Sequence, residues 1–184
     1  MNKSAVLVKI SVLLIILVSF SGCLKPEINV NSLELKIHDL VNNERIQNGL
    51  QSLEYDNELA NIARAHSIDM ANRNFFSHTN PDGLGPTERA NAAGYRTHKD
   101  FGTYYVDGIG ENICQENILE SGYDICFIPL NDWNDENELA KSVVDLWMTS
   151  PGHRQNILTS TYDVEGIGVA IASDNKVYVT QDFW

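Results

Sequence analysis

Hydrophobic residues recur every three or four positions in three stretches of the chain, which is the spacing of one face of an α-helix. The spacing predicts a helix over 32–49, with Ser32 as its N-cap, and a second helix over 56–74. A third helix is predicted over 137–151 and ends there because Pro151 prevents its continuation. Each of these helices has an apolar face that needs a surface to pack on.

A different pattern closes the chain. Residues 163–172 and 176–183 are rich in β-branched and aromatic side chains, and the polar residues 173–175 between them predict an antiparallel hairpin. The Pro- and Gly-rich segment 77–86 predicts a loop that leads into a short helix over 87–93. Helices followed by a terminal hairpin predict an α+β domain, in which helices cover a small antiparallel sheet.

The amino-terminal segment, residues 1–22, has two lysines, no acid and an uncharged, mainly apolar run over 10–20. Eleven residues at about 1.5 Å each are too short for a hydrocarbon core of roughly 30 Å, so the segment predicts a secretory signal peptide. Small residues precede Cys23, as in a lipoprotein signal, in which this cysteine receives the lipid after cleavage. The alternative is an ordinary signal peptide with an incidental cysteine. Residues 23–32 are predicted to be a tether.

Length and charge narrow the class of function. The chain has 184 residues, enough for one domain with a sizeable core, and a formal net charge of −12. Removal of residues 1–22 takes away two lysines and no acid, which leaves −14. This acidity argues against sequence-independent binding to nucleic acid and against attraction to anionic lipid. Membrane attachment is therefore expected to depend on the anchor at Cys23.

The other two cysteines are Cys114 and Cys126. An even pair outside the cell commonly closes a disulfide, which is the prediction here, and two free thiols are the alternative.

Candidate chemistry gathers at three residues in loops or next to glycine. His78 opens the 77–86 loop, His153 follows Ser150-Pro-Gly, and Glu111 lies in the segment Gly110-Glu-Asn-Ile. Structural roles are expected for His38 and His66, which lie inside predicted helices, and His98 is expected to be exposed. The chain has no His-Glu-x-x-His, no Gly-x-Ser-x-Gly and no phosphate-binding glycine loop.

Four sequence blocks together resemble one known family. They are Val41-Asn-Asn-Glu-Arg45 with Gly49-Leu50, Ala63-Arg-Ala-His-Ser67 through Phe75-Phe-Ser-His78, Gly110-Glu-Asn-Ile113, and Trp147-Met-Thr-Ser-Pro-Gly-His-Arg-Gln-Asn-Ile-Leu158. In this order they resemble the CAP superfamily of cysteine-rich secretory, antigen 5 and pathogenesis-related proteins, in its shorter prokaryotic branch. The resemblance covers 33–184 and implies an α–β–α sandwich with a cleft between the helices and the sheet.

The resemblance also implies a set of site residues. Eukaryotic members carry two histidines and two acids that bind a divalent metal such as zinc, and the matching positions are His78, Glu111 and His153. The second acid is replaced by Ser150, so zinc binding at the remaining three residues is expected to be weaker. Asp82 and Glu88 are the candidates for a substitute acid. Asn112 and Gln181 are expected to line the same cleft.

A departure from the family lies at about 114–136, where prokaryotic relatives have a short connection. This inserted loop borders the predicted cleft and is interpreted either as surface decoration or as part of a ligand grip. Its apolar residues, Phe127, Ile128, Leu130 and Trp133, are expected to pack on the domain or to mark a partner surface.

These expectations lead to one preferred function and two alternatives. The preferred function is a secreted or lipid-anchored, non-enzymatic module that binds a lipid, glycan or protein ligand in the cleft of His78, Glu111 and His153. The first alternative is a metal-assisted hydrolase, a peptidase or esterase, with Glu111 or Ser150 assisting at the same cleft. In the second alternative the acidic surface and the inserted loop form the working part.

Overall fold

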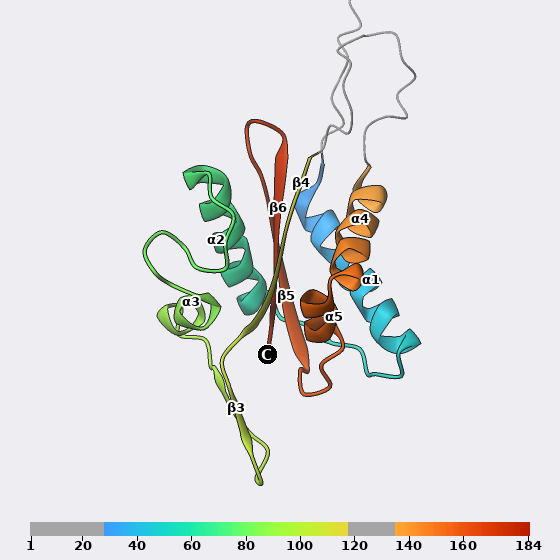
Figure 1. The fold of residues 1–184 in the computed structure, drawn as a ribbon, viewed down its shortest axis with the longest axis vertical. Helices are drawn as coiled ribbons and strands as arrows, with labels where there is room; N and C mark the ends of the chain where they lie inside the picture. The colour runs from blue at the N-terminus through green and yellow to red at the C-terminus, as the bar shows by residue number, and fades with distance from the viewer. Residues whose placement is uncertain (1–27, 118–134) are drawn as a thin grey trace, which may run out of the picture.

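The structure is a computed structural model that describes residues 28–117 and 135–184. Its secondary structure forms three layers, with a sheet in the middle (Figure 1). One face of the sheet carries α2 (Asn57–Arg73) and α3 (Pro86–Ala92). The other face carries α1 (Val30–Gln47), α4 (Glu136–Thr149) and α5 (Pro151–Ile157). The predicted α+β class and the α–β–α arrangement are confirmed.

The central sheet has the strand order β1-β5-β6-β4. Its members are β1 (Glu54–Tyr55), β5 (Val164–Ile171), β6 (Lys176–Phe183) and β4 (Gly110–Asn117). The predicted hairpin is β5–β6, and β4 pairs antiparallel with β6 at the edge of the sheet. The two-residue β1 runs parallel to β5, so the sheet is mixed rather than purely antiparallel. The pattern of hydrophobic positions did not reveal β4, although this strand carries Glu111.

Alternation along β6 divides the interior into two halves. Val177, Val179 and Phe183 belong to the large core beneath α1 and α4, together with Trp147. Tyr178 faces the other way and packs with Met70 of α2. Trp147 and Tyr178 are 1% and 2% exposed, as expected of core residues. Because neighbouring residues of a strand point to opposite faces, each position on β4 and β6 is committed to one half.

Two helix ends differ from the sequence expectation. The N-cap of α1 is Asn29, whose side chain accepts a hydrogen bond from the Ser32 backbone N–H, so Ser32 lies within the helix and is not its cap. Pro151 does end α4, but it also begins α5 one residue after Ser150. Proline is tolerated in the first turn of a helix, where its missing N–H has no intrahelical acceptor, and this explains the second, unpredicted helix.

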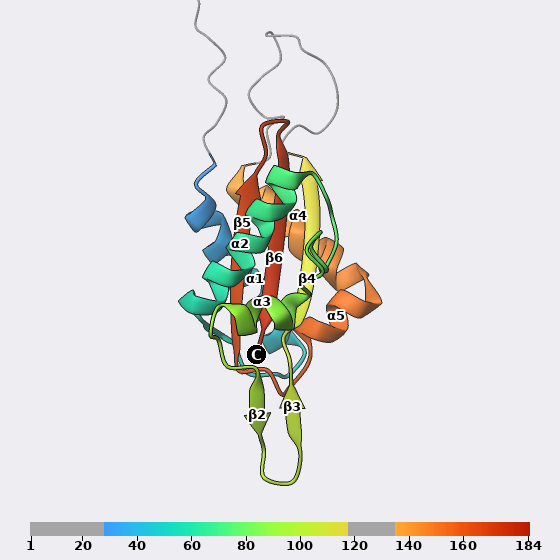
Figure 2. The ribbon, with the colours of Figure 1, turned by 90° about the vertical axis from the view of Figure 1, so that its left-hand side faces the viewer.

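A second, two-stranded sheet was also not predicted. It consists of β2 (His98–Asp100) and β3 (Tyr105–Asp107), which pair antiparallel. The hairpin projects beyond the three layers (Figure 2), and His98 lies on it, exposed as expected. Phe101 and Tyr104 stack on each other at its tip, with ring centroids 4.8 Å apart.

Several sequence expectations fall outside the described residues. They are the signal peptide of residues 1–22, the lipid site Cys23, most of the tether, Cys126 and residues 118–134 of the inserted loop. Residues 114–117 of the expected insertion belong to β4, and Glu136 begins α4.

Cys114 is buried in β4, and burial raises the pKa of its thiol to about 12. Its disulfide to Cys126 stays a prediction. Within 28–117 and 135–184, no helix is both long and apolar enough to span a membrane.

Candidate functional site

The centre of the site is a contact between His78 and Glu111. His78 follows α2 in the 77–86 loop, Glu111 lies on the edge strand β4, and His78 Nδ1 is 2.7 Å from Glu111 Oε1. The imidazole is 51% exposed, whereas the carboxylate side chain is 1% exposed. A buried carboxylate thus fixes the orientation of an accessible imidazole whose other nitrogen, Nε2, has no hydrogen-bond partner in the described part of the chain.

Arg89 of α3 ties these two residues together. One of its amino groups donates to Glu111 Oε2. The other donates to the backbone carbonyl oxygens of His78, at 2.7 Å, and of Leu84, at 3.0 Å. Its side chain is only 9% exposed. Sequence analysis did not single out Arg89, because nothing in the spacing of a seven-residue helix shows that one of its side chains reaches a neighbouring strand.

A second buried acid, Asp182, lies directly beside Glu111. The two residues are cross-strand partners in the β4–β6 pair, and Asp182 has no exposed surface. Burial, and then the negative charge of Glu111, raise the pKa of Asp182 well above its usual range. Neither carboxyl oxygen of Asp182 has a hydrogen-bond partner among the described residues, so the protonated form avoids a second uncompensated buried charge. The sequence signal for Asp182 is that it is the lone acid of β6.

His66, which lies on α2, is a further member of this group of side chains around Glu111. It is 1% exposed, and its Nε2 lies 3.0 Å from the Ser77 backbone carbonyl, in accord with the structural role expected for it. Burial lowers the pKa of His66, and the positive charge of Arg89 lowers it further. His66 therefore favours its neutral form, with Nε2 as the donor to Ser77.

His153 comes to the site from α5. Asn156 of the same helix donates to the Glu111 backbone carbonyl at 3.0 Å and to Asn112 Oδ1 at 2.9 Å, which fixes α5 against β4. His153 is half-buried, and burial lowers its pKa, with a smaller contribution from the charge of His78. Ser150 is the residue between α4 and α5 and is partly buried. We refer to His78, Glu111 and His153 as the histidine site.

Asn112 and Gln181 point away from the Glu111 side of the sheet. Both are fully buried, and Asn112 Nδ2 donates to Gln181 Oε1 and to the His153 backbone carbonyl. Gln181 also donates to Glu165 at 2.5 Å, and the other oxygen of Glu165 contacts His38 of α1. The expectation that Gln181 reaches the cleft is therefore incorrect, because alternation along β6 directs it under α1. Asn112 contributes to the site indirectly, because its hydrogen bonds to His153 and Asn156 hold α5 in place.

The substitute acids expected from the sequence do not join the histidine site. Asp82 is exposed and pairs with Arg73, with Nη1 and Oδ2 2.5 Å apart. Glu88 lies in the first turn of α3 with its carboxylate close to Gly85. The acid that the fold brings next to Glu111 is Asp182.

The family resemblance implies a zinc ion at His78, Glu111 and His153. A metal needs free lone pairs that converge on one point. Both Glu111 oxygens are already engaged, by His78 and by Arg89, and Nδ1 of His78 is committed to Glu111. Throughout 28–117 and 135–184, no three His, Cys, Asp or Glu side chains are arranged to hold a metal ion. In this arrangement the predicted ligands do not fit a metal.

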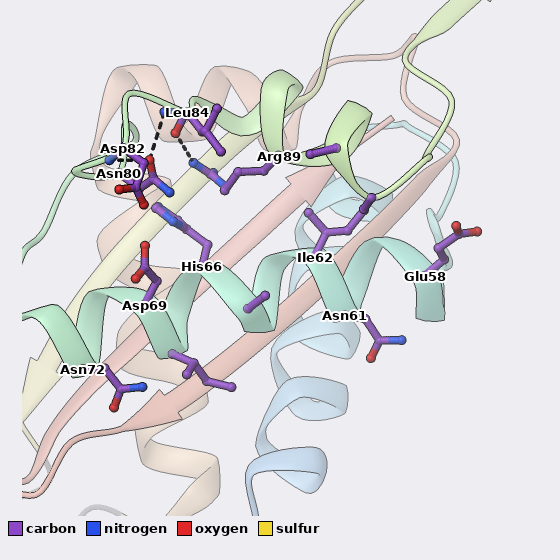
Figure 3. Close-up of a pocket in the computed structure, with 14 residues that line it drawn as sticks. Glu58, Asn61, Ile62, His66, Asp69, Asn72, Asn80, Asp82, Leu84 and Arg89 are labelled. Carbon is purple, nitrogen blue, oxygen red and sulfur yellow. Dashed lines mark hydrogen bonds between the residues drawn. The ribbon is translucent and has the colours of Figure 1, made fainter.

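A groove of about 650 Å³ lies on the other side of Arg89, between α2, α3 and the 80–84 turn (Figure 3). The His66 and Arg89 side chains both point into the space below this turn. Its walls combine apolar residues with amides and acids, among them Ile62, Ile68, Asn61, Asn72, Glu58 and Asp69. A groove of this size is within the range of small-molecule sites, and Arg89, which lines it, also contacts Glu111 of the histidine site.

The fold and site together define a class of protein: a three-layer α–β–α domain in which a loop histidine contacts a glutamate on the edge strand and a helix histidine lies near that loop histidine. The chain belongs to the CAP family, the cysteine-rich secretory protein family, whose model matches residues 38–183.

Known proteins agree with this assignment. The protein YkwD of Bacillus subtilis is 31% identical over 140 residues, which cover 76% of this chain and 43% of YkwD. An extracellular protein containing an SCP domain from Bacillus anthracis superimposes with a TM-score of 0.59 at 25% identity, over 84% of this chain and 40% of that one. An outer surface protein of Borrelia burgdorferi has a TM-score of 0.62 at 18% identity, over 86% of this chain and 96% of its own. The chain spans less than half the length of YkwD.

Proposed function

We propose that this protein is a non-enzymatic, extracytoplasmic ligand-binding module and that its ligand contacts the histidine site. The observation that supports the proposal is the His78–Glu111 pair, in which a buried carboxylate holds a half-exposed imidazole in one orientation. A fixed, exposed side chain with an unused nitrogen can bind a ligand with little loss of side-chain entropy. The neighbouring groove offers further room for a lipid, glycan or peptide.

Among the described residues no activated nucleophile is found, which favours binding over catalysis. In the described residues, no serine, threonine or cysteine side chain donates a hydrogen bond to His78 or to His153. Nucleophilic catalysis needs such a contact between nucleophile and base, although it can tighten when a substrate binds.

Hydrolysis remains the second candidate because of the same His78–Glu111 contact. A base whose other ring nitrogen is oriented by a carboxylate is two-thirds of a catalytic triad. A metal-assisted version would need zinc at His78, Glu111 and His153, so it would require the Glu111 contacts to rearrange.

The extracytoplasmic location is supported by the relatives and by the amino-terminal sequence. One structural relative is an extracellular protein and another is an outer surface protein. Residues 1–22 have the pattern of a signal peptide, and a lipid on Cys23 would tether the domain to the membrane.

The Cys23→Ser variant is expected to leave the membrane fraction. If it is retained there, the lipid anchor is ruled out.

The binding proposal is tested by the melting temperature (Tm) of the full chain with three probes, namely palmitate, cholesterol and N-acetylglucosamine trimer. A probe at a hundred times its Kd should stabilise the fold by about 2.7 kcal/mol and raise the Tm by several degrees. The rise should disappear in His78→Ala and persist in His98→Ala, which removes another exposed histidine that contacts an acid.

The same variants distinguish hydrolysis from binding. If the wild-type chain cleaves p-nitrophenyl acetate or a fluorogenic peptide, and His78→Ala abolishes that turnover while His98→Ala does not, the protein is an enzyme and the binding proposal fails. If none of the three probes is stabilising, ligand binding of these classes at the histidine site is excluded.

A further inference from the structure

The buried carboxylate of Glu111 needs a compensating positive charge. Its carboxylate side chain is 1% exposed, and an ionised carboxylate removed from water is costly unless a cation and hydrogen bonds compensate it. The family resemblance implies that a divalent metal compensates it. Within the described part of the chain, the titratable groups near Glu111 are His78, His66, Arg89 and the buried acid Asp182.

We propose that the Arg89 guanidinium is the resident cation of the histidine site and does for Glu111 what a metal ion is expected to do in related proteins. Its charge lies directly against Glu111 Oε2, and its side chain is 9% exposed. It also holds the loop that carries His78, through the His78 and Leu84 carbonyl oxygens. One side chain thus supplies the positive charge and links the loop, α3 and β4.

Guanidinium geometry suits this task. Arg has five N–H donors in a planar fork, so it can serve a carboxylate and two carbonyl oxygens at the same time. Arg89 uses one amino group for Glu111 and the other for both carbonyls. It is also permanently charged, so the compensation does not depend on the supply of a metal.

The rest of the site is consistent with this assignment. Ser150 replaces the second acid of the metal-binding relatives, so the site carries one negative charge fewer. His78 Nδ1 contacts Glu111 directly, so the two side chains leave no coordination position for a metal ion between them. A ligand therefore meets the exposed His78 imidazole, and the Glu111 carboxylate behind it is already neutralised by Arg89. The inference goes beyond the proposed binding function and does not depend on which ligand binds.

The first test is zinc addition to the full chain. One equivalent of zinc and an excess of EDTA are expected to give the same Tm, and dialysed protein is expected to retain no stoichiometric zinc. One retained zinc per chain, with a rise in Tm that His78→Ala removes, would overturn the inference. That result would leave the ligand-binding proposal standing, because it is tested separately with organic probes.

The second test is a double-mutant cycle on Arg89 and Glu111. Arg89→Met leaves Glu111 buried without its cation and is expected to lower the folded-to-unfolded ratio about a hundredfold or more. Adding Glu111→Gln removes the stranded charge, so the double variant should recover at least tenfold of that loss. A purely structural Arg89 would give additive losses and no recovery, which would contradict the proposal.

Two further variants complete the test. Arg73→Met removes another arginine that pairs with an acid, but at an exposed position, so it is expected to change the ratio less than about fivefold. Arg89→Lys keeps the charge and loses the fork, and it should fall between wild type and Arg89→Met. If Arg89→Met is no worse than Arg73→Met, the assignment of Arg89 is wrong.

Discussion

Gly168 of β5 lies against the backbone of Arg64 in α2. A Cβ placed on Gly168 would be 1.9 Å from the Arg64 backbone nitrogen, and one on Gly166 would be 2.2 Å from that of Ala60. The absence of a side chain at Gly166 and Gly168 lets α2 pack this closely on the sheet. The positions of His66, and of the loop with His78 that follows α2, therefore depend on glycine at both of these positions.

Gly168→Ala should accordingly destabilise the protein strongly. The methyl group meets backbone, which cannot rotate away, so we expect a loss of about 3 kcal/mol or more in the free energy of unfolding. Urea denaturation measures it. The control is Gly152→Ala in α5, where a Cβ meets nothing within 4 Å and the better helix propensity of alanine should keep stability equal or raise it. Equal losses in both variants would refute the close contact.

Replacement of Arg45 should be similarly costly. Arg45 is 2% exposed and donates to four backbone carbonyl oxygens, of Gln51, Ile157, Thr159 and Tyr162. Arg45→Met leaves these buried acceptors without donors, and we expect a loss of about 3 kcal/mol in unfolding free energy. Arg154→Met, which removes one exposed hydrogen bond to Asn48, should cost less than about 1 kcal/mol.

His66 should make stability fall with acid. Its pKa is lower in the folded state than the unfolded value of about 6.5, so the unfolded chain takes up the proton first as the pH drops. The contribution is complete above about pH 6.5 and is lost progressively below it. His66→Gln, which keeps a donor for Ser77, should reduce the difference in unfolding free energy between pH 7.5 and 5.5. The exposed His98→Gln is the matched control, and an unchanged difference in His66→Gln would contradict the assignment.

Asp182 should act in the opposite direction. Its pKa is raised in the folded state, so its favourable contribution is present below the unfolded pKa of about 3.9 and is lost as the pH rises toward the folded value. Asp182→Asn keeps the shape of the side chain and has no proton to lose. The variant should therefore gain stability over wild type as the pH is raised from 4 to 8, measured by urea denaturation at each pH. A gain that does not grow with pH would show that Asp182 ionises normally.

Regular helices could be predicted from the sequence because their signal is local. The periodicity of residues 33–46 and 59–70 placed α1 and α2 to within a few residues, and β-branched runs gave β5 and β6. The strand β4 could not be found this way. Its residues Glu111 and Gln115 are polar, and it becomes a strand because β6 offers a pairing edge. The β2–β3 hairpin and α5 were missed for related reasons, since their boundaries depend on turns and on one proline.

The residues of the candidate site likewise fall into those that a sequence motif identifies and those that only the fold reveals. His78, Glu111 and His153 could be named from motifs, and the structure brings His78 and Glu111 into contact. Arg89 and Asp182 carry no motif, yet both lie against Glu111. Gln181 was assigned to the cleft although its position on β6 turns it toward Glu165.

The sequence by itself determined the family, the helices α1 to α4 and the candidacy of His78, because these follow from residue types at short range. Only the tertiary structure decided which charge compensates Glu111 and on which face each residue of β4 and β6 lies. The reason is physical. A buried carboxylate must be neutralised by whatever the fold brings within hydrogen-bond distance, and pairing of distant strands and loops sets that distance.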